Sequence, residues 1–234
     1  HRPDRRVVAS YSSREEAAFA TEIGNGLIRE SALCHGVEHS FEVHTYAAVS
    51  SRGSGLGASS ALAVALAACF ERMRGVENPA LSTARAAWTV EIDRLRRPVG
   101  RQDHMAAAHG GLRLYAFEGV TARVERTFSE EDAAWVARHL VLLPLSGGHD
   151  AREILSGVRS AAALESAAAA VPEAIRAIED RDAGLLGRAL AMGHASKREI
   201  PGAVPDEVAA RVEAALLVPG VRGCKVAGAG GGGH

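Results

Sequence analysis

The chain has 234 residues, of which 47% are hydrophobic and 24% charged, a composition typical of a soluble globular protein with one large or two small domains. Its formal net charge of −1 leaves no broad basic or acidic surface, and no apolar run is long enough to span a bilayer. Neither nucleic acid nor a membrane is therefore the expected partner. Three scattered cysteines, Cys34, Cys69 and Cys224, argue against a disulfide framework and favour the cytoplasm. The ten histidines lack regular ligand spacing and are expected on the surface or in packing contacts.

The first fifty residues predict a strand, a helix and a second strand. Residues 7–10 are a short apolar run, and residues 15–36 carry apolar side chains mostly at helical spacing. In residues 41–49 hydrophobic positions alternate with polar or small ones. This alternation is typical of a half-exposed antiparallel strand.

Residues 51–70, with the sequence SRGSGLGASSALAVALAACF, predict a glycine-rich loop that leads into a helix. Gly53, Gly55 and Gly57 permit positive φ and let backbone N–H groups approach a ligand closely. Ser59 and Ser60 suit the N-cap or first turn of the Ala-rich helix that follows. Such a helix start directs free N–H groups and the positive end of the helix dipole at an anion, most often a phosphate. The simpler alternative is a glycine turn before a buried helix.

Two well-known phosphate-binding loops fit this stretch poorly. The P-loop pattern is absent because no lysine follows the glycines. Gly53, Gly55 and Ala58 satisfy the looser dinucleotide pattern, but that pattern needs a buried parallel strand before it and a strand after its helix. Here an alternating strand precedes the loop, and a second helix follows. The dinucleotide interpretation is therefore weak.

The remainder of the chain predicts two strands in the middle and a mostly helical second half. Pro98 and Gly100 are expected to end a helix that covers residues 78–97. The expected helices cover residues 78–97, 151–180, 184–199 and 206–217. Strand patterns cover residues 112–117 and 120–128, a compact apolar run typical of a buried strand covers 139–145, and a last strand opens into the glycine run 228–233. The change from strand patterns to mostly helical patterns predicts a domain boundary between residues 138 and 139.

Four clusters are candidates for chemistry. They are the loop at residues 53–60, the carboxylates of Glu91 and Asp103, and the glycine run at residues 228–233. Each also has a simpler interpretation. The loop could be a glycine turn before a helix, Glu91 a solvated residue on a helix, Asp103 a residue that caps a turn, and the glycine run a flexible terminus. Phosphoryl transfer accounts for all four together. Backbone N–H groups hold the phosphates, a serine hydroxyl and one carboxylate suit Mg²⁺, and a second carboxylate accepts or orients the proton of the acceptor hydroxyl.

Three segments carry a family resemblance. GSGLGASSA resembles the signature P-x-x-x-G-L-G-S-S-A of the GHMP small-molecule kinases, with Ser51 or Arg52 in place of proline and Ala58 in place of the first serine. VEIDRLRRPVGRQDHMAAAHGG resembles I-E-R-D-x-L-G-x-P-x-G-K-Q-D-Q-x-A-A-x-x-G-G of the heptose 7-phosphate kinases in that family. GCKVAGAGGGG resembles their G-x-K-x-x-G-A-G-G-G-G. Arg101 stands where these kinases have lysine, and Lys197 matches a family lysine less securely.

The resemblance implies an α+β protein with the GHMP kinase fold. Residues 1–138 would form the ribosomal-protein-S5-domain-2-like nucleotide domain, and residues 139–234 a ferredoxin-like α/β domain. Family segments are expected before residue 1 and after residue 234. The implied reaction is phosphorylation of a sugar hydroxyl by ATP and Mg²⁺, with a heptose 7-phosphate converted to the 1,7-bisphosphate.

The resemblance also implies roles for individual residues. Asp103 would be the catalytic carboxylate, and Ser59, Ser60 and Glu91 would hold Mg²⁺. The residues implied to bind ATP are Gly53, Ser54, Gly55, Leu56, Gly57, Ala58, Ser59, Ser60, Gly228, Ala229, Gly230 and Gly231. The residues implied to bind the sugar phosphate are Arg101, Gln102, Asp103, Gly147, Gly230 and Gly231.

Two alternatives stay open at this point. The segment LSGGHDAREIL is one residue shorter than the family's T-G-x-x-R-x-A-x-x-I-L and lacks its arginine, so the acceptor could instead be fucose, galactose or a modified sugar. The other alternative is a non-catalytic relative that binds nucleotide or sugar and acts through a partner. Homo-oligomerisation is possible and has no readable signal in the sequence.

Overall fold

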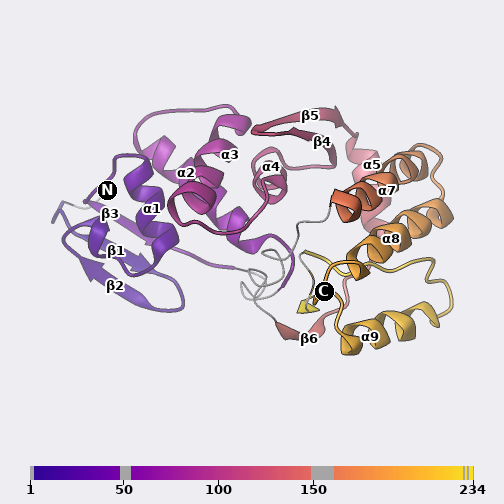
Figure 1. The fold of residues 1–234 in the computed structure, drawn as a ribbon. Helices are drawn as coiled ribbons and strands as arrows, with labels where there is room; N and C mark the ends of the chain where they lie inside the picture. Colours follow the sequence, from indigo (N-terminus) through magenta and orange to yellow (C-terminus); the bar gives the residue numbers. More distant parts are fainter. Residues whose placement is uncertain (1–2, 48–53, 149–160, 229, 231, 234) are drawn as a thin grey trace. The chain divides into compact units, whose positions relative to one another are not determined.

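The computed structural model describes residues 3–47, 54–148, 161–228, 230 and 232–233 (Figure 1). The chain forms two compact units, the first of residues 1–50 and 57–126 and the second of residues 51–56 and 127–234. The glycine-rich loop therefore divides between Leu56, which belongs to the second unit, and Gly57, which belongs to the first. The division of the chain into two family domains at residues 138 and 139 stays a prediction.

A three-stranded sheet stands at one end of the first unit (Figure 1). Its strands lie in the order β2-β1-β3, with bounds β1 Val7–Ser10, β2 Arg14–Ala17 and β3 Phe41–His44. Strand β1 is antiparallel to β2 but parallel to β3, with Val7 opposite Phe41. The expectation of an antiparallel strand at residues 41–49 is therefore wrong. The short helix α1, Gly26–Cys34, lies between β2 and β3 in sequence and returns the chain so that β3 runs alongside β1 in the same direction.

The helix expected over residues 15–36 is shorter than the pattern predicted. Residues 14–17 pair with β1 as a strand, and a single 3₁₀ turn, η1 (Ala20–Glu22), follows. Helix α1 begins after Asn25, whose side chain accepts hydrogen bonds from the N–H groups of Leu27 and Ile28 at 3.1 and 3.2 Å. This N-cap fixes the start of the helix.

Four helical segments and a two-stranded sheet complete the first unit. Their bounds are α2 Ala58–Met73, α3 Ala80–Trp88, the π-helical segment η2 Thr89–Arg94, α4 Gln102–His109, β4 Arg113–Glu118 and β5 Thr121–Thr127. Helix α2 lies at the centre of the core, where Phe70 meets Phe41 edge to face with ring centroids 5.2 Å apart. Its buried alanines, Ala63 and Ala67, let neighbouring elements pack closely. The strands expected at residues 112–117 and 120–128 are confirmed within one or two residues.

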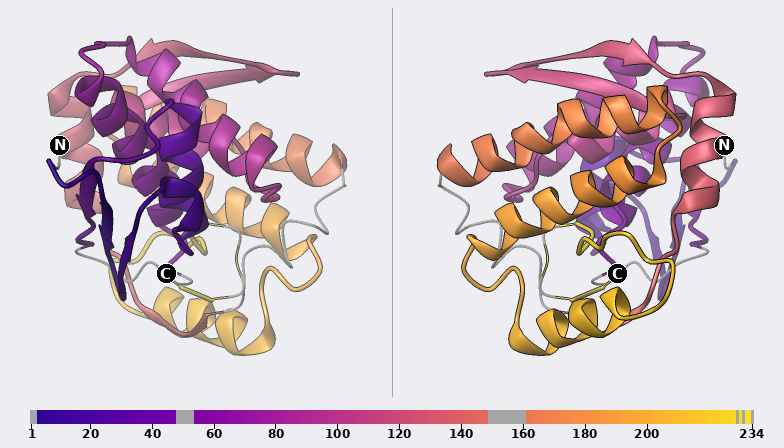
Figure 2. Two further views of the ribbon diagram at one scale, coloured as in Figure 1. Left: turned by 90° about the vertical axis from the view of Figure 1, so that its left-hand side faces the viewer. Right: turned by 90° about the vertical axis from the view of Figure 1, so that its right-hand side faces the viewer.

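The second unit is mostly helical. Its elements are α5 Glu130–His139, β6 Leu145–Gly148, α7 Ala161–Glu179, α8 Ala183–Arg198, α9 Asp206–Leu216 and β7 Gly232–Gly233. Ser129 and Asp132 form a capping box that starts α5. Helices α7 and α8 form a hairpin and lie side by side (Figure 2). Strands β6 and β7 pair antiparallel, with Leu145 opposite Gly233.

Two strand predictions in the second unit are wrong. Residues 140–144 are irregular and β6 begins only at Leu145, while Val141 is 83% exposed and Leu142 61% exposed. An apolar run is buried only where another layer packs over it, and the described part of this unit places none over residues 141–143. Residues 221–227 also lack strand structure. Among the described residues no helix is both long and apolar enough to cross a bilayer, and all three cysteines are free.

Candidate active site

The N-terminus of α2 is formed by Gly57, which has φ 69° and ψ 20°. This left-handed conformation favours glycine over other residues. Gly57 has no side chain to cap the helix, so the N–H groups of Ala58, Ser59 and Ser60 lie at the positive end of the helix dipole without an acceptor inside the helix. The predicted helix start, with Ser59 and Ser60 in its first turn, is confirmed, while residues 51–53 of the predicted loop lie outside the described residues.

Glu91 lies at the centre of a buried polar cluster beside this helix start. Its side chain is fully buried, and it comes from η2, a π-helical segment of a kind often found at functional sites. The Ser59 hydroxyl donates to Glu91 Oε1 at 2.6 Å, and the Ser60 hydroxyl donates to Oε2 at 2.9 Å. Both serines thus bind the carboxylate. The structure brings Ser59, Ser60 and Glu91 together, as the resemblance implies.

Two basic side chains complete the cluster. Arg97 Nη1 donates to Glu91 Oε1 at 2.7 Å and to the Ser59 hydroxyl at 2.9 Å. His104 Nε2 lies 2.9 Å from Oε2, within ion-pair distance, and the His104 ring is fully buried. Burial raises the pKa of Glu91, but His104, Ser59, Arg97 and Ser60 together outweigh this effect and lower the pKa to about 2. Glu91 is therefore an anion at neutral pH.

Asp103, in the first turn of α4, lies against Gly57. A Cβ atom placed on Gly57 would be 3.1 Å from Asp103 Cγ and 3.2 Å from its Oδ2. Asp103 is exposed as a whole residue, while its carboxyl group packs against Gly57. Partial loss of water around the carboxyl raises its pKa, His104 opposes the rise, and Glu91 adds to it. The structure thus brings Asp103 to the start of α2.

Gly55 and Gly228, from the two glycine runs, are in backbone contact inside the second unit. Both have left-handed φ, 70° and 61°, and a Cβ on Gly228 would lie 2.5 Å from the Gly55 Cα. Lys197 fixes the second run, because its Nζ donates to the carbonyl of Val226 at 2.8 Å and to that of Gly228. Burial, together with nearby Lys225, lowers the pKa of Lys197 to about 8. Gly55 and Gly228 therefore lie together within the second unit.

The structure also places Ser54, Gly147 and Gly230, three other residues predicted to bind nucleotide or sugar. Ser54 is buried, and its hydroxyl accepts a hydrogen bond from the N–H of Leu56 at 3.4 Å. Gly147 lies in β6, and Gly230 has a left-handed φ of 104° and packs on the backbone of Ala203. Gly53, Ala229 and Gly231 lie outside the described residues.

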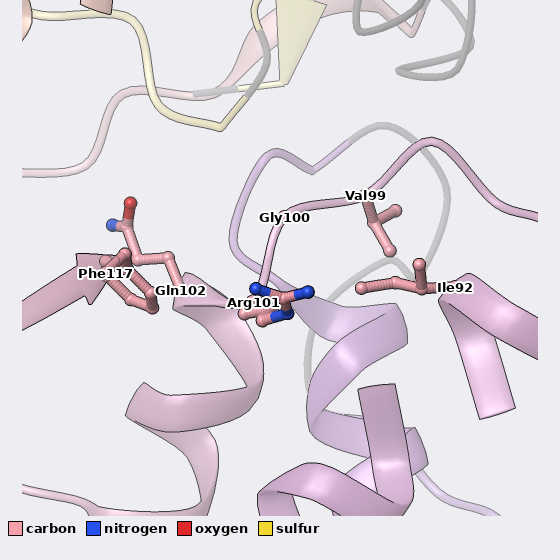
Figure 3. Close-up of a pocket in the computed structure, with 6 residues that line it drawn as sticks. All are labelled: Ile92, Val99, Gly100, Arg101, Gln102 and Phe117. Atoms are coloured by element: carbon pink, nitrogen blue, oxygen red, sulfur yellow. The ribbon is translucent and has the colours of Figure 1, made fainter. Parts of the chain in front are cut away.

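Arg101 and Gln102 line a cavity of about 400 Å³ beside the start of α4 (Figure 3). The Arg101 guanidinium lies 5.5 Å from the centre of the Trp88 ring and donates to the carbonyl of Gly119 at 2.6 Å. In Figure 3 the side chain of Gln102 extends away from its helix, while Ile92 and Val99 supply an apolar wall. The cavity combines polar donors with apolar surface, as small-ligand pockets do.

Arg97 and His104, which both lie at Glu91, are not among the site residues predicted from the sequence. His104 stands next to Asp103, where the family segment has glutamine, and this difference was a usable signal. Arg97 occupies a variable position of the family segment and follows Glu91 by six residues, so the sequence offered no periodic pattern for it. Its role depends on the turn that follows η2.

The oxygens of Ser59, Ser60 and Glu91 fit the donors that Mg²⁺ prefers, a hydroxyl and a carboxylate. Among the described residues no group of three His, Cys, Asp or Glu side chains converges to hold a metal. A Mg²⁺ ion bound at these three side chains would need further oxygen ligands, such as phosphate or water.

Residues 18–111 match the sequence profile described as the GHMP kinases N terminal domain. This segment is similar to the N-terminal domain of the GHMP kinases, and the chain has the α+β fold of these kinases. The D-glycero-alpha-D-manno-heptose 7-phosphate kinase of Campylobacter jejuni is 28% identical over 205 residues, which are 83% of this chain. The match spans 60% of the length of that relative.

Two solved structures share the fold. The D-glycero-D-manno-heptose 1-phosphate kinase of Bacteroides thetaiotaomicron aligns with a TM-score of 0.72 at 20% identity, over 97% of this chain and 71% of that one. The galactokinase of Lactococcus lactis, complexed with galactose, aligns with a TM-score of 0.65 at 16% identity, over 99% of this chain and 74% of that one.

Proposed function

We propose that the protein is a sugar kinase that uses ATP and Mg²⁺ to phosphorylate the anomeric hydroxyl of a heptose 7-phosphate, giving the 1,7-bisphosphate. The single observation that carries this proposal lies within the first unit. There, Asp103 packs against Gly57, and Ser59 and Ser60, two and three residues later, hold the buried carboxylate of Glu91. An anion-binding helix start, a partial set of magnesium ligands and a second carboxylate are the parts that phosphoryl transfer requires.

Each of these residues has a role in the proposed reaction. The first-turn amides of α2 bind phosphate oxygens. Ser59, Ser60 and Glu91 would hold Mg²⁺, which when bound neutralises phosphate charge. Asp103 orients the acceptor hydroxyl and takes its proton. The raised pKa of Asp103 suits this role, because a base works best when its pKa is close to the working pH.

The second unit supports the same proposal independently. Gly55, from the first glycine run, contacts Gly228, from the second, and Lys197 fixes the carbonyls of the second run. Such a contact leaves room for backbone alone, as in loops that approach a phosphate closely. We assign nucleotide contacts to these glycine runs and to the neighbouring Ser54 and Leu56.

The choice of a heptose phosphate rests on the motif resemblance and on the Campylobacter jejuni relative, which is named for that substrate. The cavity beside α4 supports a polar acceptor, since Arg101 and Gln102 supply donors along its wall. Part of the Arg101 guanidinium is already engaged with Gly119 and Trp88, which leaves Gln102 as the freer donor.

The test is release of ADP by the full-length protein from MgATP in the presence of a panel of acceptors. The panel contains heptose 7-phosphate, heptose 1-phosphate, galactose and fucose, and ³¹P NMR identifies the position of the new phosphate. We expect turnover with heptose 7-phosphate and a product signal from an anomeric phosphate. Turnover with another sugar alone would support the kinase activity but contradict heptose 7-phosphate as the substrate. ATP binding without ADP release from any acceptor would contradict the kinase proposal and support a non-catalytic relative.

A further inference from the structure

Arg97 is tied to Glu91 by its backbone as well as by its side chain. The N–H of Arg97 donates to the carbonyl of Glu91 at 2.9 Å. Arg96, with a left-handed φ of 53°, reverses the chain just before it. This turn carries the Arg97 guanidinium to Glu91 Oε1 at 2.7 Å and to the Ser59 hydroxyl at 2.9 Å. The contact is thus built into the local backbone.

The guanidinium contacts two oxygens that a bound Mg²⁺ would need. Glu91 is fully buried, and a buried carboxylate requires a counterion. Arg97 supplies that charge, since its guanidinium lies 2.7 Å from Glu91 Oε1. A divalent cation arriving without other ligands would meet a carboxylate that is already neutralised and a positive charge beside it. The geometry therefore opposes binding of a bare metal ion.

The interactions of Arg97 differ when the metal is bound to a nucleoside triphosphate. Phosphate oxygens accept a guanidinium through charge-assisted and often paired hydrogen bonds, so they offer Arg97 a replacement for Glu91. The Arg97 side chain is 30% exposed while that of Glu91 is fully buried, so Arg97 is the partner with room to move. Since the described residues hold no complete metal cluster, the phosphates would also complete the coordination shell.

We propose that Arg97 is a positioning residue that couples metal binding to nucleotide binding. Its guanidinium neutralises Glu91 and excludes free divalent cations in the nucleotide-free protein, and it transfers to phosphate oxygens when the metal enters as a metal–triphosphate complex. This inference rests on the proposed function, because it takes Ser59 and Glu91 as metal ligands.

The first test measures binding of Mn²⁺ alone to the nucleotide-free, full-length protein by electron paramagnetic resonance. Arg97→Gln is expected to bind Mn²⁺ about tenfold or more tightly than the wild type, a typical size for coupling between sites. The matched control is Arg94→Gln, which removes one charge from the same segment but pairs with Glu30 at 2.8 Å. Its Mn²⁺ affinity should equal that of the wild type. Adding Glu91→Gln to Arg97→Gln should abolish the gain.

The second test measures the affinity of the same variants for the magnesium complex of a non-hydrolysable ATP analogue by calorimetry. Arg97→Gln should bind this complex more weakly than the wild type, whereas Arg97→Lys should keep most of both properties. Unchanged Mn²⁺ affinity in Arg97→Gln would overturn the inference, and so would tighter binding of both ligands. Thermal unfolding checks that the variants fold. If Arg97→Gln does not fold, Arg97→Lys decides, since Mn²⁺ binding tighter than wild type would then contradict the coupling.

Neither test uses a sugar acceptor, so the inference and the proposed function fail separately. A protein without turnover on any sugar that still shows the opposite shifts for Mn²⁺ and nucleotide retains the coupling and loses the kinase assignment. Turnover with unshifted Mn²⁺ affinity retains the kinase and removes the role of Arg97.

Discussion

The carboxylate of Asp103 packs against the α-carbon of Gly57, so that a Cβ on Gly57 would lie 3.1 Å from Asp103 Cγ. The two residues are 46 positions apart in sequence, and each belongs to a different predicted motif. Their contact places a carboxylate with a raised pKa at the start of an Ala-rich helix whose first-turn serines hold Glu91.

Gly57→Ala should impair turnover more than stability. The substitution places a Cβ in a left-handed conformation, at a cost of about 1–2 kcal/mol, and presses it against Asp103. Displacing a catalytic group by about 1 Å can lower turnover on the order of 100-fold. The matched control is Gly36→Ala, which has φ 65° and nothing within 4 Å of the added Cβ. Urea unfolding should give similar losses for the two variants, and only Gly57→Ala should lose activity. Equal activity of Gly57→Ala and Gly36→Ala would show that the contact between Gly57 and Asp103 does not matter for turnover.

Asp103→Asn should lower kcat by about 10²–10⁴ because a general base is removed, while nucleotide affinity stays close to that of the wild type. In the wild type, activity should fall as the pH drops through the pKa of Asp103. Burial raises that pKa, so the acidic limb should lie above the ordinary aspartate value of 3.8. Steady-state kinetics across pH and calorimetric titration with nucleotide measure both effects. Full activity in Asp103→Asn would remove the residue from the mechanism.

Glu91 should make folding stability depend on pH in acid. Its pKa is about 2 in the folded protein against 4.5 normally, so the unfolded chain binds more protons between these values. The contribution is therefore fully present above about pH 4.5 and is lost as the pH falls towards about 2. Its size is on the order of 3 kcal/mol.

Comparing the wild type with Glu91→Gln by urea unfolding at several pH values measures this contribution. The variant should be less stable at neutral pH and should show a flatter dependence on acid. Glu77→Gln is the control, since Glu77 pairs with Arg72 at the exposed surface and should matter little. Parallel curves for the wild type and Glu91→Gln would show that the cluster does not hold an ionised glutamate.

Gly228→Ala should weaken nucleotide binding by forcing the two glycine runs apart. An added Cβ would lie 2.5 Å from the Gly55 Cα and 2.7 Å from the Gly55 carbonyl oxygen, so the backbone must shift. Gly202→Ala, with φ 75° and open space around the added Cβ, has the same left-handed backbone without the collision. Thermal unfolding and nucleotide titration should show larger losses for Gly228→Ala than for this control. Equal affinities would exclude the glycine contact from the nucleotide site.

The local features of the site followed from the sequence because several short-range signals agreed. Glycine at a left-handed position, serines in the first turn and a run of helix-forming alanines all indicate the same helix start. The pairing of Glu91 with Ser59 and Ser60 came from the motif resemblance, and the structure brings these three side chains together.

The features that sequence analysis missed depend on long-range contacts. Arg97 reaches Glu91 only because the turn at Arg96 reverses the chain. The parallel direction of β3 depends on the path of the chain through α1, and an alternating strand pattern does not report that path. The apolar residues at 141–143 were expected to be buried, yet a pattern of hydrophobicity does not show whether a second layer covers it.

A crystal structure of the full-length protein with a magnesium complex of a non-hydrolysable ATP analogue and heptose 7-phosphate tests the central claim most directly. Our account predicts that Glu91 and one of the hydroxyls of Ser59 and Ser60 lie at magnesium-ligand distance, about 2.0–2.1 Å. It also predicts that Asp103 forms a hydrogen bond with the anomeric hydroxyl. A nucleotide bound away from the first turn of α2, or an acceptor hydroxyl out of reach of Asp103, would contradict the account.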